Sequence, residues 1–146
     1  MSLLVPNEGE TRLLLELLAG GTTREDWTCR LYKTNVTPAE TDTISTYTEA
    51  DFTGYVAKTL TRTVNPGTTW TTPASGAPSG GWSPEAAVAE SSYLAQVWSP
   101  LSAQDIYGYF VQGASSSLLI FAELFSTVKP LVSGDTLTLT PRFGLA

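Results

Sequence analysis

Two apolar runs, IYGYFV at residues 106–111 and LLIFAE at residues 118–123, flank the turn-forming GASS of residues 113–116. Runs rich in β-branched and aromatic residues that are joined by a short Gly/Ser segment are typical of a β-hairpin. Both runs are apolar on both faces, as in central strands that are covered on each side. The sequence therefore predicts a central hairpin, covered by a second sheet on one side and by a helix or another subunit on the other.

Alternating patterns outside this hairpin predict further strands. Residues 27–32 place Trp, Cys and Leu at every second position, which predicts a strand with one buried face. Residues 52–61 are rich in β-forming residues and predict an extended segment. Residues 86–98 fit a helix or a strand, and we choose a strand because the surrounding pattern is β. Residues 136–142 predict a final strand after a turn at residues 133–135.

Six to eight short strands after a single helix predict a mainly β fold. The expected architecture is a β-sandwich or a Greek-key, jelly-roll-like barrel with one short N-terminal helix. The length of 146 residues and the 42% of hydrophobic residues fit one domain over residues 1–146. Residues 65–84 are rich in Pro, Gly, Ser and Thr, which predicts a long loop or a loose ribbon within that domain.

The one convincing helical pattern lies near the start of the chain. Asn7 and Glu10 have the spacing of a capping box, and Gly20-Gly21 is expected to end the helix. Arg12 and Glu16 are spaced as an i,i+4 pair, on the side opposite an apolar stripe. The stripe consists of Leu13, Leu14, Leu17 and Leu18. A helix this short needs a partner, which is either its own sheet or a neighbouring subunit.

The composition argues against catalysis, because the chain has no histidine, one cysteine and one methionine. Ser/His/Asp and Cys/His arrangements cannot be built, and the common zinc sites lack their ligands. We therefore predict that the protein is not an enzyme and has no catalytic residue, metal or cofactor. Paired carboxylates remain open as a glycosidase-like alternative, with Glu49 and Asp51 or Asp105 and Glu123 as candidates, although turn capping and solvation explain these acids better.

The charge pattern limits the possible partners. The formal net charge is -6 and the eight basic residues are scattered, so we expect no direct contact with nucleic acid. We also expect no membrane interaction, because no apolar run approaches the roughly 18 residues of a membrane span. Charged residues make up only 15% of the chain, as in surfaces that neighbours cover. The alternative is a Thr-rich β-protein that exposes its hydroxyl groups to water.

Large apolar side chains suggest where a neighbour binds. Residues 65–84 carry two tryptophans, which either fold back onto their own sheet or anchor an interface. Together with the helical stripe and a tyrosine of the central hairpin, they form the predicted interface. Its residues are Leu13, Leu17, Trp70, Trp82 and Tyr107.

Three runs of sequence carry a resemblance to a known family. They are LYKTNVTP at residues 31–38, YTEADFTGY at residues 47–55, and the hairpin strand at residues 106–111 followed by AELF at residues 122–125. The chain resembles small structural virion proteins of tailed bacteriophages. The resemblance implies a β-rich structural component; it supplies no reaction and no functional residue.

Within that family the length and acidity favour a capsid decoration, or cement, protein. Such a protein sits on the capsid surface, binds between subunits of the major capsid protein and commonly forms a homo-oligomer, with a trimer favoured. A tail, head-fibre or baseplate component is the nearest alternative. A carbohydrate-binding β-sandwich is the main rival outside the family, since aromatic side chains could form a sugar platform. The candidates for that platform are Trp70, Trp82, Trp98, Tyr107 and Tyr109.

Overall fold

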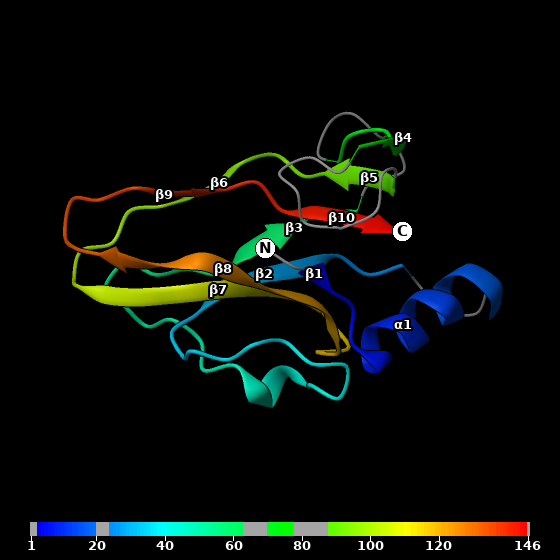
Figure 1. Cartoon of the computed structure of the whole chain (residues 1–146), viewed down its shortest axis with the longest axis horizontal. Coiled ribbons are helices and arrows are strands. Elements are labelled where there is room, and N and C mark those ends of the chain that lie inside the picture. Colours follow the sequence, from blue (N-terminus) through cyan, green and yellow to red (C-terminus); the bar gives the residue numbers. More distant parts are fainter. Residues whose placement is uncertain (1–2, 20–23, 63–69, 78–87, 146) are drawn as a thin grey trace.

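The protein is centred on a five-stranded antiparallel sheet, with the strands in the order β1, β8, β7, β2, β3 (Figure 1). A computed structural model describes residues 3–19, 24–62, 70–77 and 88–145. The strands of this sheet are β1 (Leu3–Leu4), β2 (Trp27–Tyr32), β3 (Lys58–Leu60), β7 (Gln104–Gly113) and β8 (Leu119–Leu131). The two longest strands, β7 and β8, form the predicted hairpin, so its central position is confirmed.

A second layer of two small antiparallel sheets faces this central sheet (Figure 1). One has the strand order β10, β5, β4, and the other pairs β6 with β9. Their bounds are β4 (Ala74–Gly76), β5 (Val88–Ser92), β6 (Gln96–Trp98), β9 (Leu137–Leu139) and β10 (Arg142–Leu145). The mainly β, sandwich-like fold with one short N-terminal helix is therefore confirmed.

The main hydrophobic core fills the space between the two layers. From β2, Trp27, Cys29 and Leu31 are buried and Thr28 and Arg30 between them are half-buried, as predicted, but Tyr32 at the end of the strand is also fully buried, so the prediction of a single buried face is wrong there. Trp98 of β6 and Leu137 of β9 enter the same core from the second layer. These side chains come from distant parts of the chain, and their burial joins the layers.

The opposite face of the central sheet is covered as well. Tyr32 and Phe110 lie on this face and pack with Tyr47, which stacks on Phe110 at a centroid distance of 5.3 Å. Tyr47 belongs to the connection over residues 33–57 and follows a 3₁₀ turn, Ile44–Thr46. The hairpin is thus covered on both sides, and its own chain supplies both covers.

Three predicted strand segments are shorter than expected. Over residues 52–61 only Lys58–Leu60 is a strand, because a turn closes at Tyr55, whose N–H donates to the Phe52 carbonyl (2.9 Å), and Gly54 has a φ of +88°. Residues 88–98 form two strands, β5 and β6, instead of one. The final segment is likewise divided into β9 and β10.

The Pro/Gly-rich region at residues 65–84 is partly ordered into the sandwich. Ala74–Gly76 forms β4 at the edge of the second layer and pairs with β5. Residues 65–69 and 78–84, which include Trp82, lie outside the described residues. The short strand β4 fits the loose-ribbon alternative of the prediction, and backbone pairing with β5 organises a segment whose composition does not predict a strand.

Helix α1 (Asn7–Leu14) continues into a π-helical turn, Leu15–Ala19. The predicted cap at Asn7 is wrong, because Pro6 is the N-cap residue and no side chain caps the helix. The nearby carboxylate of Glu8 instead accepts the backbone N–H of Leu119 (3.2 Å). This bond ties the start of α1 to β8. The expected end of the helix at Gly20-Gly21 lies outside the described residues.

Candidate interaction surface on helix α1

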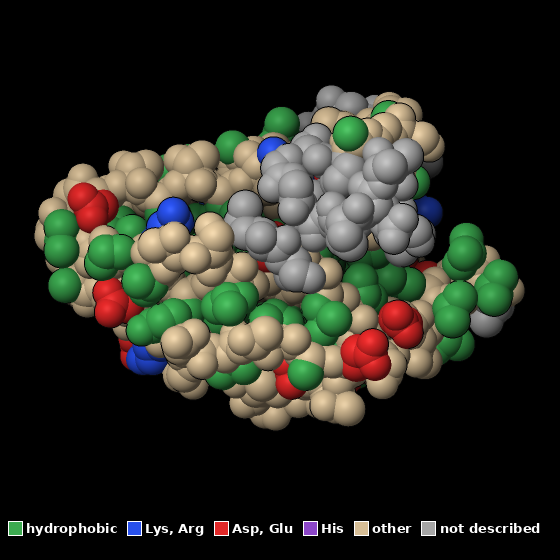
Figure 2. Space-filling view, in the orientation of Figure 1, with side chains coloured by type: hydrophobic (Ala, Val, Ile, Leu, Met, Phe, Trp, Pro, Cys, Tyr) green, Lys and Arg blue, Asp and Glu red, His purple; other side chains and the backbone are tan. Residues whose placement is uncertain are grey.

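The second half of the helical segment carries an exposed apolar surface. Leu17 and Leu18 are 78% and 75% exposed, and Leu14 and Leu15 are about half exposed. We call these four residues the leucine patch. Figure 2 shows hydrophobic side chains gathered at the end of the molecule formed by this segment. Contiguous exposed apolar groups of this kind mark interaction sites, whereas scattered single ones do not.

The predicted apolar stripe of the helix is divided between two environments. Leu13 is half-buried and packs against the main core, so at this position the helix docks on its own sheet. Leu17 is exposed and does not pack against that core, and Leu15, at the start of the π-helical turn, belongs to the exposed group as well. Docking on the sheet therefore accounts for only one leucine of the stripe.

A hollow of about 540 Å³ lies beside the leucine patch. Its described apolar lining comes from the helix (Leu13, Leu14, Leu17), from Val5 and from Phe143 of β10. Its described charged lining consists of Glu10, Glu16, Arg24 and Arg62. The patch and the hollow together form a surface with both projecting and recessed apolar parts.

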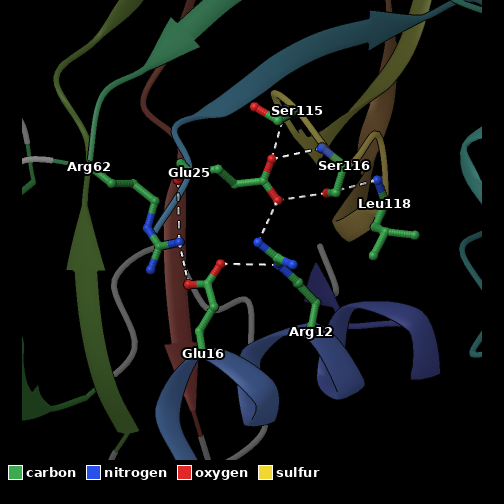
Figure 3. Close-up of polar contacts among 7 residues, drawn as sticks. All are labelled: Arg12, Glu16, Glu25, Arg62, Ser115, Ser116 and Leu118. Carbon is green, nitrogen blue, oxygen red and sulfur yellow. Dashed lines mark hydrogen bonds and ion pairs between the residues drawn. The ribbon is translucent and has the colours of Figure 1, made fainter. Parts of the chain in front are cut away.

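A chain of ion pairs fixes the helix that carries the patch (Figure 3). Arg12 pairs with Glu16 (Nε to Oε1, 3.2 Å), which confirms the predicted i,i+4 pair, and also with Glu25 (Nη2 to Oε1, 3.0 Å). Glu16 in turn pairs with Arg62 (Oε2 to Nη1, 2.6 Å). All four side chains are less than 20% exposed, so water screens these charges far less than surface pairs.

Glu25 is the anchor of this network on the β-sandwich. Its carboxylate accepts the N–H groups of Ser115 (2.7 Å) and Ser116 (2.9 Å) and the hydroxyl of Ser116 (2.6 Å). Burial raises the pKa of Glu25, but the hydrogen bonds from Ser116 and Ser115 and the charge of Arg12 outweigh burial and leave the pKa below its ordinary value. Glu25 is therefore held as a carboxylate that binds the β7–β8 turn and the helix together.

Arg62 connects the same network to the core. Its guanidinium lies over the ring of Trp27, 4.5 Å from the centroid, while its Nη1 also pairs with Glu16. Arg62 follows β3, and Trp27 begins β2, so these contacts tie the helix to the central sheet. Three parts of the sandwich thus hold α1 through polar contacts, and its exposed leucines are left without a partner among the described residues.

Trp70 and Tyr107 of the predicted interface lie in other environments, and Trp82 lies outside the described residues. Trp70 is half-buried, and its ring makes edge contacts with Trp27 (centroids 5.7 Å apart) and Tyr93 (5.1 Å). Its indole therefore folds back on the protein's own core. Tyr107 is half-buried against the second core cluster. The structure brings Leu13 and Leu17 together beside one hollow and does not bring Trp70 or Tyr107 to it.

The aromatic side chains do not form an exposed platform. Over residues 3–19, 24–62, 70–77 and 88–145, every Trp, Tyr and Phe side chain is buried or half-buried. Trp98 is buried and its Nε1 donates to the carbonyl of Val56 (2.9 Å), and Tyr109 is buried beside Glu123. A flat sugar platform built from the described candidates is therefore not favoured, and Trp82 lies outside the described residues.

Neither candidate pair of carboxylates is arranged for catalysis: the acids of the first pair each form an ion pair, and those of the second pair lie apart. Glu49 is paired with Arg30, and Asp51 with Lys33 (2.6 Å), so both acids have structural partners. Asp105 is exposed and lies opposite Pro130, whereas Glu123 is buried opposite Tyr109, four residues further along β7. Hydrogen bonding to the Tyr109 hydroxyl (2.7 Å) gives Glu123 a structural role.

Comparison with known proteins gives no family assignment: no family model matches the chain, and no curated protein matches it. Among the described residues, no group of three or more His, Cys, Asp or Glu side chains could hold a metal ion. No helix in the described part of the chain is long and apolar enough to cross a membrane. The interaction surface at the end of α1 and on the π-helical turn is therefore the feature on which we base a function.

Proposed function

We propose that the protein is a structural component of a tailed-bacteriophage virion, where it decorates the capsid surface as a homo-oligomer bound to the major capsid protein. The observation that carries this proposal is the leucine patch on a helix that buried ion pairs hold in place. An apolar surface with a fixed position suits assembly into the homo-oligomer, because little conformational freedom is lost when copies bind. The resemblance of residues 31–38, 47–55 and 106–111 to small virion proteins supports the same class.

The proposed mechanism is mechanical. A decoration protein adds buried area at joints between capsid subunits, and the central residues of such a contact supply most of its binding energy. The net charge of -6 would keep the protein from binding the packaged genome. The two-layer sandwich, with apolar clusters on both faces of its central sheet, provides a rigid body for this role.

Quantitative mass spectrometry of purified virions from the source phage tests the proposal. We expect a copy number close to that of the major capsid protein, because a decoration protein occupies every equivalent site. A few copies per particle would contradict capsid decoration and favour a tail, head-fibre or baseplate position. Absence from the virion would overturn the virion role altogether.

A further inference from the structure

We propose that the leucine patch and the hollow beside it form the contact between copies of this chain, an inference that rests on the homo-oligomer of the proposed function. The occupant of the surface is a second copy, in which the same residues are presented. The reason is that the surface complements itself in shape, in polarity and in charge.

The shape of the surface provides the first argument. Leu18 is 75% exposed and does not line the hollow, so it projects beside it. The hollow is walled by Leu13, Leu17 and Phe143 and is large enough to receive apolar side chains. In a contact between identical copies, the leucines of one chain enter the hollow of the other.

The charges at the hollow provide the second argument. Glu10 and Arg24 both line it and both are exposed. Within the described part of the chain, neither side chain has an ion pair or a hydrogen bond, whereas Glu16 and Arg62 are paired with each other. Because each copy carries one unpaired acid and one unpaired base on this surface, Glu10 of one chain can form an ion pair with Arg24 of the next.

Each copy thus presents a projection, a hollow, an acid and a base. Repeating such a contact by rotation gives a closed ring of two or three chains, in which every patch is covered. The contact must also overcome the repulsion between chains that each carry a net charge of -6. Burial of the leucines supplies the attraction, and the Glu10 to Arg24 pairs set the relative orientation.

Sedimentation equilibrium of the full chain over a range of concentrations tests this inference. We expect a dimer or trimer for the wild type, and association weakened by at least about tenfold for the double variant Leu17→Glu, Leu18→Glu. Leu101→Glu is the matched control, because Leu101 is 62% exposed but lies outside the patch, and it should associate like the wild type. All of these positions are exposed, and thermal unfolding verifies that each variant remains folded.

A charge exchange tests the proposed orientation. Glu10→Arg alone and Arg24→Glu alone should each weaken association, and the two changes combined should restore it. A wild type that stays monomeric at all concentrations, or an oligomer that the patch variants do not weaken, would overturn the inference. If the protein is monomeric but abundant in virions, the inferred contact is wrong and the decoration role is retained. If it is an oligomer but absent from virions, the decoration role is wrong and the inferred contact is retained.

Discussion

Replacing Glu25 with Ala is expected to lower the free energy of unfolding by about 1–3 kcal/mol, the usual cost of leaving partly buried polar groups without their partner. The change leaves the Arg12 guanidinium without its anchor and the N–H groups of Ser115 and Ser116 without their acceptor. The loss leaves the two N–H groups without the acceptor that satisfied them and removes one of the two carboxylate partners of Arg12. We expect the end of α1 to detach from the β7–β8 turn as a result.

Chemical denaturation measures this effect, with Glu40→Ala as the control. Glu40 is exposed, and only its backbone carbonyl makes a described bond, to the N–H of Asn7. The control should therefore change the free energy of unfolding by less than about 0.5 kcal/mol. If Glu25→Ala were as mild as the control, the ion-pair network would not be what holds the helix.

The same carboxylate predicts how stability depends on pH. Because the pKa of Glu25 is lower in the folded protein than its ordinary value near 4.5, the folded state favours the charged form. Its contribution to stability is fully present above that ordinary value and is lost as the pH falls through the lower folded pKa. In Glu25→Ala we expect the fall in stability below pH 4.5 to be smaller than in the wild type, as followed by denaturation at successive pH values.

Replacing Gly9 with Ala is expected to destabilise the protein by about 1–3 kcal/mol, the range for overfilled packing. Helix propensity alone predicts the opposite, because Ala is favoured over Gly in a helix by about 1 kcal/mol. At Gly9, however, an added Cβ would lie 2.2 Å from the carbonyl oxygen of Ile120, which is a backbone atom and cannot turn away. The helix must move off β8 to accept the methyl group.

Gly76→Ala is the matched control for this variant. Gly76 lies in β4, and an added Cβ there meets no atom within 4 Å. Thermal or chemical unfolding should therefore show that the two variants change the free energy of unfolding in opposite directions or by clearly different amounts. A stabilised Gly9→Ala protein would show that propensity outweighs the contact and that α1 does not pack closely on β8.

The fold class was accessible from the sequence where local patterns determine the structure. Alternation at residues 27–32 and the two apolar runs around residues 113–116 predict β2, β7 and β8, because burial of one or both faces leaves a direct trace in composition. Segments that depend on distant partners were less predictable. Neither β4 nor the turn at Gly54 follows from its own residues, since β4 depends on pairing with β5 and the turn is held by a hydrogen bond from the Leu101 N–H to the Thr53 carbonyl (2.9 Å).

The candidate surface was partly predictable for the same reason. The leucine stripe and the pair Arg12 with Glu16 follow from helical spacing. Glu25 could not be recognised, because its partners at residues 115 and 116 are 90 and 91 positions away and no sequence pattern links them. The role of Arg62 could not be predicted either, because its partner Glu16 is 46 positions away. Conversely, Trp70 suggested an anchor by its residue type, yet the fold places it against Trp27.

The most direct test of the account measures whether the leucine patch is covered in the particle. A Leu18→Cys variant places a thiol on the patch, and its rate of alkylation can be compared between dilute free protein and purified virions. The native thiol of Cys29 gives little background, because it is fully buried and burial raises its pKa. We predict that the new thiol reacts readily in dilute free protein and is protected in virions. Equal reactivity in the free protein and in the virion would contradict the account.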